Sequence, residues 1–133
     1  MTLSAYMTRM RDVPFGYGRN DCLSFVSGAL RAQGLSTLPT EWSEGYSDIK
    51  GAIRRERELV GKSRHRNIIE AMDDMYQRVF TLFPTDGSIV ARRESGPLGY
   101  AFGVVYRGGC AFVSERGIIE DQVRPGDMFW TVR

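Results

Sequence analysis

Apolar side chains near the start of the chain recur at helical spacing. From Asp21 to about Gln33 the apolar positions fall on one face of a helix, and Gly34 is a typical residue to end it. A shorter repeat over residues 3–11 predicts an earlier helix. The stretch between them, DVPFGYGRN, contains one proline and two glycines and is expected to be a loop.

Two further helices are expected before residue 81. One runs from about Ser47 to Val60, is capped by Ser47 or Asp48, and is interrupted by Gly61. Its stretch RRERE mixes both signs of charge, which is typical of a solvated helix face. The other spans about residues 66–80 and is predicted to face the core through a stripe of Ile68, Ile69, Met72, Met75, Tyr76 and Val79.

The pattern changes after about Gly87. Short β-branched and aromatic runs, such as YAFGVVYR and MFWTVR, are separated by Gly, Pro and Asp, which is typical of strands and turns. The segment YRGGCAF predicts a hairpin with its turn at Gly108-Gly109. Helices followed by strands predict an α+β domain, with N-terminal helices packed on a C-terminal antiparallel β-sheet. At this length, residues 1–133 are expected to form one domain.

Composition and charge argue against several classes of function. A net charge of +2 gives no reason to expect a nucleic-acid or membrane partner. No apolar run approaches the roughly 20 residues that cross a bilayer, and the N-terminal stretch does not resemble a signal peptide. Two cysteines do not make a disulfide framework, which favours a reducing compartment. No Cys/His spacing suits zinc and no glycine pattern matches a nucleotide loop, so neither metal nor cofactor is expected.

Cys22 is the main candidate for chemistry, because it lies in the first turn of a predicted helix. Unpaired backbone N–H groups and the helix dipole favour a thiolate there. Asn20 or Asp21 can cap this end and fix the turn that presents the sulfur. A nucleophile also needs a base and an oxyanion donor, whereas free cysteine is a common core residue. Position alone therefore favours a core role.

Three segments together resemble a known group of proteins. FGYGRNDC, FGVVYRGG and MFWTVR are similar to the F-x-[WY]-G-x-x-DC motif, the G-V-V-x-G-G motif and the terminal Trp-containing strand of a family of small phage and prophage proteins. That family resembles NlpC-type papain-like cysteine peptidases, which act on peptidoglycan. The resemblance covers about Pro14 to Val132 and implies a papain-like (NlpC-type) domain.

The resemblance implies four catalytic roles, of which one is retained. The nucleophile maps to Cys22, while the oxyanion tyrosine maps to Phe15, which has no hydroxyl. The histidine base maps to Ala101 in the segment AFG, and the residue that orients it maps close to Ser114, a weak substitute. Loss of a general base costs about 10²–10⁴-fold in rate, and loss of an oxyanion donor about 10²–10³-fold. Cys22 is therefore interpreted as a vestigial nucleophile position.

His65 is the only histidine in the chain. It lies between basic residues, before the predicted sheet that supplies the base in the resembling enzymes. A solvated or capping role is favoured over that of the missing base.

Three functions are compatible with these patterns. The resemblance favours a non-catalytic structural or assembly component of a bacteriophage virion, at the tail or head–tail junction, made in the host bacterial cytoplasm. Its expected partners are other virion proteins in a symmetric, multi-copy assembly. The alternatives are a peptidoglycan-cleaving cysteine peptidase or amidase, completed by His65 or a partner chain, and a module that binds peptide or glycan in the old cleft.

Aromatic residues outside the predicted helices are candidates for contacts with these partners. Trp42 and Tyr46 are the candidate interface residues, because aromatic side chains are enriched at interface cores. Core packing explains Trp42 equally well and is the favoured role of Trp130.

Overall fold

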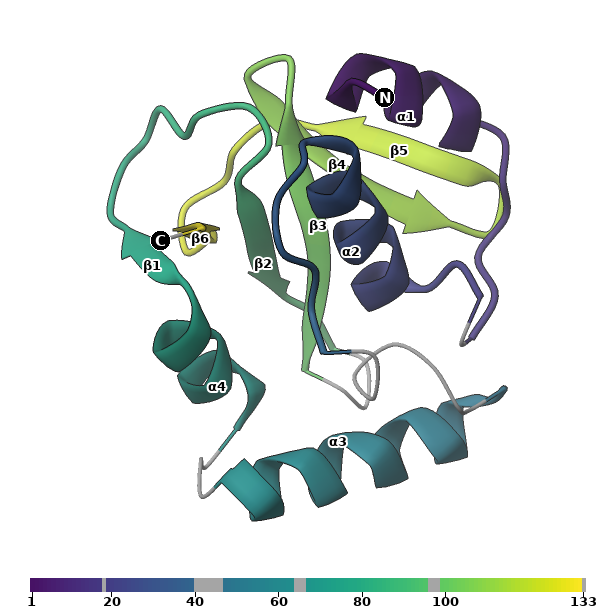
Figure 1. Cartoon of the computed structure of the whole chain (residues 1–133), viewed down its shortest axis with the longest axis vertical. Helices are drawn as coiled ribbons and strands as arrows, with labels where there is room; N and C mark the ends of the chain where they lie inside the picture. Colours follow the sequence, from purple (N-terminus) through teal and green to yellow (C-terminus); the bar gives the residue numbers. More distant parts are fainter. Residues whose placement is uncertain (18, 40–46, 64–66, 96–98, 133) are drawn as a thin grey trace.

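The computed structural model of the chain describes residues 1–17, 19–39, 47–63, 67–95 and 99–132 (Figure 1). These residues form four helices and an antiparallel sheet of six strands, which confirms the α+β class. The helices are α1 (Leu3–Met10), α2 (Cys22–Ala32), α3 (Ile49–Ser63) and α4 (Ile68–Met75). The strands are β1 (Gln77–Val79), β2 (Ile89–Arg93), β3 (Tyr100–Tyr106), β4 (Gly109–Ser114), β5 (Gly117–Asp121) and β6 (Met128–Thr131).

The strands follow the order β1-β6-β2-β3-β4-β5 across the sheet, and each neighbouring pair is antiparallel. β6 comes last of these strands in sequence but lies between β1 and β2 in space. Its Trp130 is paired with Arg78 of β1 on one side and with Ile89 of β2 on the other. The sheet therefore depends on pairings between residues far apart in the sequence.

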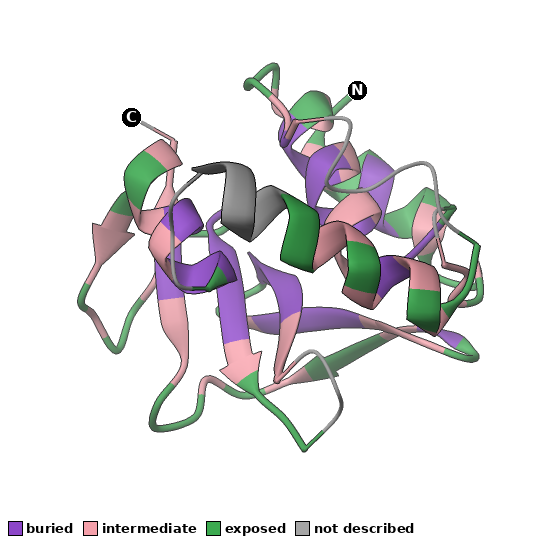
Figure 2. Cartoon of the chain, turned by 90° about the horizontal axis from the view of Figure 1, so that it is seen from below, coloured by how far each residue is buried: buried purple, intermediate pink, exposed green. Residues whose placement is uncertain are grey.

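Apolar side chains form one cluster on each face of the sheet. The larger cluster joins α1, α2 and α4 to one face, and the buried residues lie mainly there and along the strands (Figure 2). The smaller cluster lies on the other face and consists of Val90, Val105, Cys110, Phe112 and Phe129. Alternation along β2 and β3 separates the two clusters, as expected for strands with both faces covered.

Local signals explain the helix that begins at Cys22. Its N-cap is Asp21, whose carboxylate accepts a hydrogen bond from the Ser24 backbone N–H at 2.9 Å. Gly34 follows the C-cap with a φ of +75°, a conformation that glycine adopts without strain. The predicted helix over residues 21–33, with its end at Gly34, is thus confirmed.

The predicted helix over residues 66–80 is too long. α4 ends at Met75, and Tyr76 has extended backbone angles. Residues 77–79 form β1 instead, because β6 supplies a hydrogen-bonding partner for them. Tyr76 and Val79 continue the helical apolar repeat, so this non-local pairing overrides a local pattern. The sheet consequently begins before Gly87.

Two smaller predictions are also corrected. α3 continues to Ser63 and is not interrupted at Gly61, since a single glycine costs a helix only about 1 kcal/mol. The hairpin turn lies at Arg107-Gly108, both with positive φ, and Gly109 already belongs to β4. The Asp86 carboxylate accepts hydrogen bonds from the backbone N–H groups of Arg107 and Gly108, both at 3.1 Å, and so holds an arginine in a conformation usually taken by glycine.

Candidate functional site

Cys22 is held by the loop that precedes α2. The Asn20 side-chain amide donates to the carbonyl oxygens of Val13 and Pro14, both at 3.1 Å, which closes the loop. Asp21 then caps the helix, and the Ser24 hydroxyl oxygen accepts a hydrogen bond from the Asp21 backbone N–H at 2.9 Å. Of the two predicted capping residues, Asp21 caps the helix and Asn20 fixes the loop. Cys22 is the first residue of the helix that they position.

The Cys22 thiol lies beside the beginning of β3. It is partly buried against the larger apolar cluster, and the backbone of Phe102 forms a hydrogen bond with its sulfur. The Phe102 side chain belongs to the same cluster, whereas Ala101 packs against the smaller cluster on the other face. β3 thus brings the Ala101–Gly103 segment next to Cys22, but the neighbouring side chain on the helix-covered face is a phenyl group.

Burial governs the protonation of Cys22. It raises the pKa of the thiol to about 12, and the negative charges of Asp21 and Glu94 act in the same direction. Hydrogen bonds from the backbone of Phe102 and Leu23 lower the pKa but do not offset these effects. The helix N-terminus therefore fails to produce a thiolate at this position, and the thiol is protonated at neutral pH.

Tyr17 is a polar neighbour of Cys22 to which the resemblance to NlpC-type enzymes assigns no role. Burial raises the pKa of its hydroxyl; a Cys22 thiolate, once formed, and the charges of Asp21 and Glu94 raise it further. Its ring meets that of Phe15 edge-on, with 4.7 Å between the ring centroids. Tyr17 follows Phe15 by two residues in the same glycine-rich loop. This closeness in sequence is the signal that could have identified Tyr17 as a neighbour of Cys22.

Glu94 is the other neighbour of Cys22 that was missed. It follows β2, and its exposed side chain carries a charge that acts on both Cys22 and Tyr17. Only the fold brings Glu94 close to a residue 72 positions earlier, so no local pattern could have identified it.

Ser114 does not have a free hydroxyl for catalysis. Its Oγ donates to the carbonyl oxygen of Gly117 at 2.7 Å and accepts from the Arg116 backbone N–H at 3.2 Å. Its carbonyl oxygen accepts from the Phe15 backbone N–H at 2.9 Å. Ser114 therefore stabilises the turn between β4 and β5 and anchors the loop before α2.

Trp130 is fully buried in the larger cluster, which confirms its predicted core role. Its indole N–H donates to the Asp73 carboxylate at 2.8 Å, and Arg78 donates to the same oxygen at 2.9 Å. The Arg78 guanidinium also lies over the indole ring, 4.9 Å from its centroid. Asp73 is thus a structural residue that joins α4 to β1 and β6.

Trp42, Tyr46 and His65 lie outside the described residues.

A second polar group lies at the smaller apolar cluster. Arg92 forms two hydrogen bonds with Asp127, at 2.9 and 2.8 Å, and one with Asp121 at 2.8 Å. The Cys110 sulfur is fully buried nearby, 3.9 Å from Asp127 Oδ2, and burial raises the pKa of its thiol to about 11. These charges pair with one another and hold β2, β5 and the segment before β6 together.

Within the described ranges, no group of three or more His, Cys, Asp or Glu side chains is arranged to hold a metal ion. None of the helices in that part of the chain is both long and apolar enough to cross a membrane.

The family model described as "Domain of unknown function (DUF6950)" matches residues 1–132, so the chain belongs to this family. No curated protein and no solved structure matches it.

Proposed function

We propose that this chain is a non-catalytic, papain-like (NlpC-type) domain that serves as a structural or assembly component of a bacteriophage virion. The observation that carries the non-catalytic part of this proposal is the state of Cys22. Its thiol opens a helix beside a strand of an antiparallel sheet, which suits a papain-like nucleophile, but its pKa is about 12. Ala101, where the resemblance maps the base, has no titratable group.

A thiol in this state is a poor nucleophile. With a pKa of about 12, far less of Cys22 is thiolate at pH 7 than the few per cent of an ordinary cysteine. The nearby carboxylates of Asp21 and Glu94 disfavour the thiolate further. This electrostatic environment argues against the peptidase or amidase alternative.

The placement in a virion rests on the resemblance to phage and prophage proteins. In this proposal the chain is made in the host bacterial cytoplasm and works through contacts with other virion proteins in a symmetric, multi-copy assembly. Large apolar side chains exposed on the loop between β1 and β2 support contact as the mode of action, because extended exposed apolar patches mark interaction sites.

Alkylation by iodoacetamide tests the non-catalytic state. In a Cys110→Ala variant, Cys22 is the only thiol, and its alkylation at pH 7.5 should be at least about 100-fold slower than that of free cysteine. The Cys22→Ala variant, which retains only Cys110, measures the background reaction. Alkylation of Cys22 faster than that of free cysteine, together with peptidoglycan hydrolysis that Cys22→Ala abolishes, would establish the peptidase alternative.

Mass spectrometry of purified phage particles tests the placement. The chain should be present in particles at a constant ratio to the other virion proteins, and Cys22→Ala should leave particle yield and infectivity nearly unchanged. A chain found in infected-cell lysate but never in particles contradicts the placement.

Tyr17 and Glu94 favour one further candidate, a module that binds peptide or glycan in the old cleft. They place a phenol and an exposed carboxylate beside a thiol that has no catalytic use. Binding of soluble peptidoglycan fragments that is weakened at least tenfold by Tyr17→Phe would support this candidate. Equal binding by the wild type and the variant would exclude this use of the cleft.

A further inference from the structure

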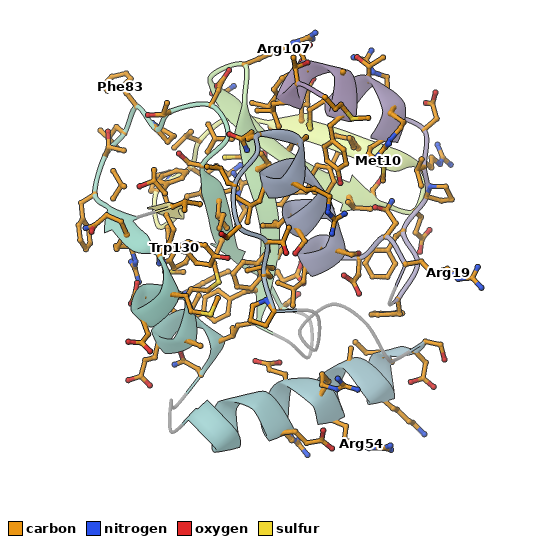
Figure 3. All side chains as sticks on the ribbon, in the orientation of Figure 1. Met10, Arg19, Arg54, Phe83, Arg107 and Trp130 are labelled. Atoms are coloured by element: carbon orange, nitrogen blue, oxygen red, sulfur yellow. The ribbon has the colours of Figure 1, made fainter. Side chains whose placement is uncertain are left out.

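Three large apolar side chains project from the loop between β1 and β2. Phe80, Leu82 and Phe83 are 88%, 76% and 90% exposed. The Thr81 hydroxyl accepts a hydrogen bond from the Phe83 backbone N–H at 2.9 Å, so the turn that presents Leu82 and Phe83 is internally bonded. Figure 3 shows Phe83 pointing away from the body of the molecule. We call residues 80–83 the apolar loop.

A hollow with a volume of about 630 Å³ lies beside the apolar loop. Its walls are the tip of the loop, the turn between β3 and β4, and the end of β5 with the residues after it. The lining residues include Leu82, Phe83, Tyr106, Arg107, Glu120 and Val123. Asp86 fixes the β3–β4 turn through its two backbone hydrogen bonds, so this wall is held in place without a partner.

The exposed area has the size of an interface core. A buried aromatic side chain removes about 150–250 Å² from water, so Phe80, Leu82 and Phe83 together expose on the order of 400–600 Å². That matches the largest apolar patch of a typical monomer, which is often functional. A standard interface buries about 800 Å² on each partner. The apolar loop alone supplies about half to three quarters of this value.

We propose that the apolar loop and the hollow form the contact between two copies of this chain related by a two-fold axis. The projection and the hollow adjoin on one surface, because Leu82 and Phe83 belong to both. A two-fold axis through such a surface lets Phe83 of each copy enter the hollow of the other, as a self-complementary interface requires.

The charges at the rim fit the same arrangement. Arg107 and Glu120 both line the hollow and are exposed, and they carry opposite charges. In a two-fold pair, Arg107 of one copy can face Glu120 of the other. This dimer contact would be one of the contacts in the proposed symmetric assembly. Only its use in a phage particle rests on the proposed function.

Sedimentation equilibrium of the purified full chain, between about 1 and 200 µM, tests the dimer. The wild type should dimerise, and a Leu82→Ser/Phe83→Ser variant should raise the dissociation constant at least tenfold while keeping its circular dichroism spectrum. Leu35→Ser, at an exposed apolar residue outside this surface, is the matched control and should dimerise like the wild type. A wild type that is monomeric at 200 µM, or a dimer that the double variant leaves intact, overturns the proposal.

Charge exchange tests the orientation of the two copies. Arg107→Glu and Glu120→Arg should each weaken dimerisation about two- to fivefold, and the double exchange should restore it. If the double exchange weakens dimerisation by the sum of the two single effects, Arg107 and Glu120 do not face each other across the two-fold axis, and this contact is contradicted.

Vesicles of phosphatidylcholine and phosphatidylglycerol distinguish a lipid surface from a second copy. The wild type should not co-sediment with them, and co-sedimentation that Leu82→Ser/Phe83→Ser abolishes overturns the proposal. The dimer and the particle are tested separately: a chain that dimerises through this surface but is missing from particles contradicts only the virion placement.

Discussion

The two ends of β3 use their neighbouring side chains in opposite ways. At its beginning, beside Phe102, the groups suited to chemistry are committed to the fold: the Cys22 thiol is partly buried and protonated, and Asp21 caps a helix. Past its end, beyond Tyr106, side chains suited to a core are exposed on the apolar loop. A chain selected for catalysis would keep its nucleophile accessible and its apolar groups covered. The reverse distribution is the one that the proposed function, which acts by contact, requires.

The largest expected effect comes from the middle of β3, which connects the two ends. A Cβ atom at Gly103 would collide with the carbonyl oxygen of Ala111 and the ring of Phe112. We expect Gly103→Ala to lower the free energy of unfolding by about 3 kcal/mol, as measured by urea denaturation. Gly99→Ala is the control: it has open space around it and should cost only about 1–2 kcal/mol through its positive φ. Equal costs at both glycines would mean that β3 and β4 can separate.

At the Cys22 end, we expect Cys22→Ala to cost about 1 kcal/mol at pH 7, because it removes one partly buried sulfur atom. The free-energy cost of Cys22→Ala should shrink at alkaline pH. The pKa of Cys22 rises from an ordinary 9.0 to about 12 on folding, so the folded state holds the proton more tightly than the unfolded state. Its contribution is complete below pH 9 and is lost as the pH rises towards 12.

Thermal unfolding between pH 7 and 12 measures this effect. The wild type should lose stability above pH 9, to which Cys110 and Tyr6 also contribute, because burial raises the pKa of their side chains to about 11 and about 12. The gap in stability between the wild type and Cys22→Ala should narrow and then reverse over the same range, because a rise in the thiol pKa from 9.0 to about 12 is worth more than the roughly 1 kcal/mol that the side chain contributes at pH 7. A gap that is constant with pH would show that Cys22 has an unperturbed thiol.

The smallest effect is expected at the other end of β3. Phe83→Ala should change the free energy of unfolding of the monomer by less than about 0.5 kcal/mol, since the side chain is 90% exposed. Chemical denaturation at a concentration below the dimer dissociation constant isolates this value. A loss above about 1 kcal/mol would mean that Phe83 packs within its own chain, which would remove the contrast between the two ends.

Local signals predicted much of the helical part of the fold. The α2 boundaries follow from Asp21, from the apolar repeat and from Gly34, all of which act within a few residues of the helix. Asp48 likewise caps α3, with its carboxylate accepting from the Gly51 backbone N–H at 2.7 Å. Such interactions join residues that are close together in the sequence, so a single sequence is enough to predict them.

The elements that the sequence pattern placed wrongly, β1 and the β3–β4 turn, depend on partners that are distant in sequence. β1 exists because β6 pairs with it, and the hairpin turn falls on Arg107 because Asp86 holds that backbone. The surroundings of the candidate site have the same origin. Glu94 reaches Cys22 only through the fold, and burial of the thiol reverses the expectation drawn from its helix position. The local pattern of apolar residues indicates neither the distant partners of these elements nor the burial of the Cys22 thiol.

The place of β6 between β1 and β2 has a consequence for synthesis on the ribosome. β1 and β2 emerge with no strand between them; until residues 128–131 are available, β1 has no partner among the described strands and β2 keeps one edge unpaired. Unpaired strand edges are where nascent chains associate wrongly. The six-stranded sheet can therefore form completely only after β6 has left the ribosome, and until then β1 and β2 present strand edges that are open to wrong pairing.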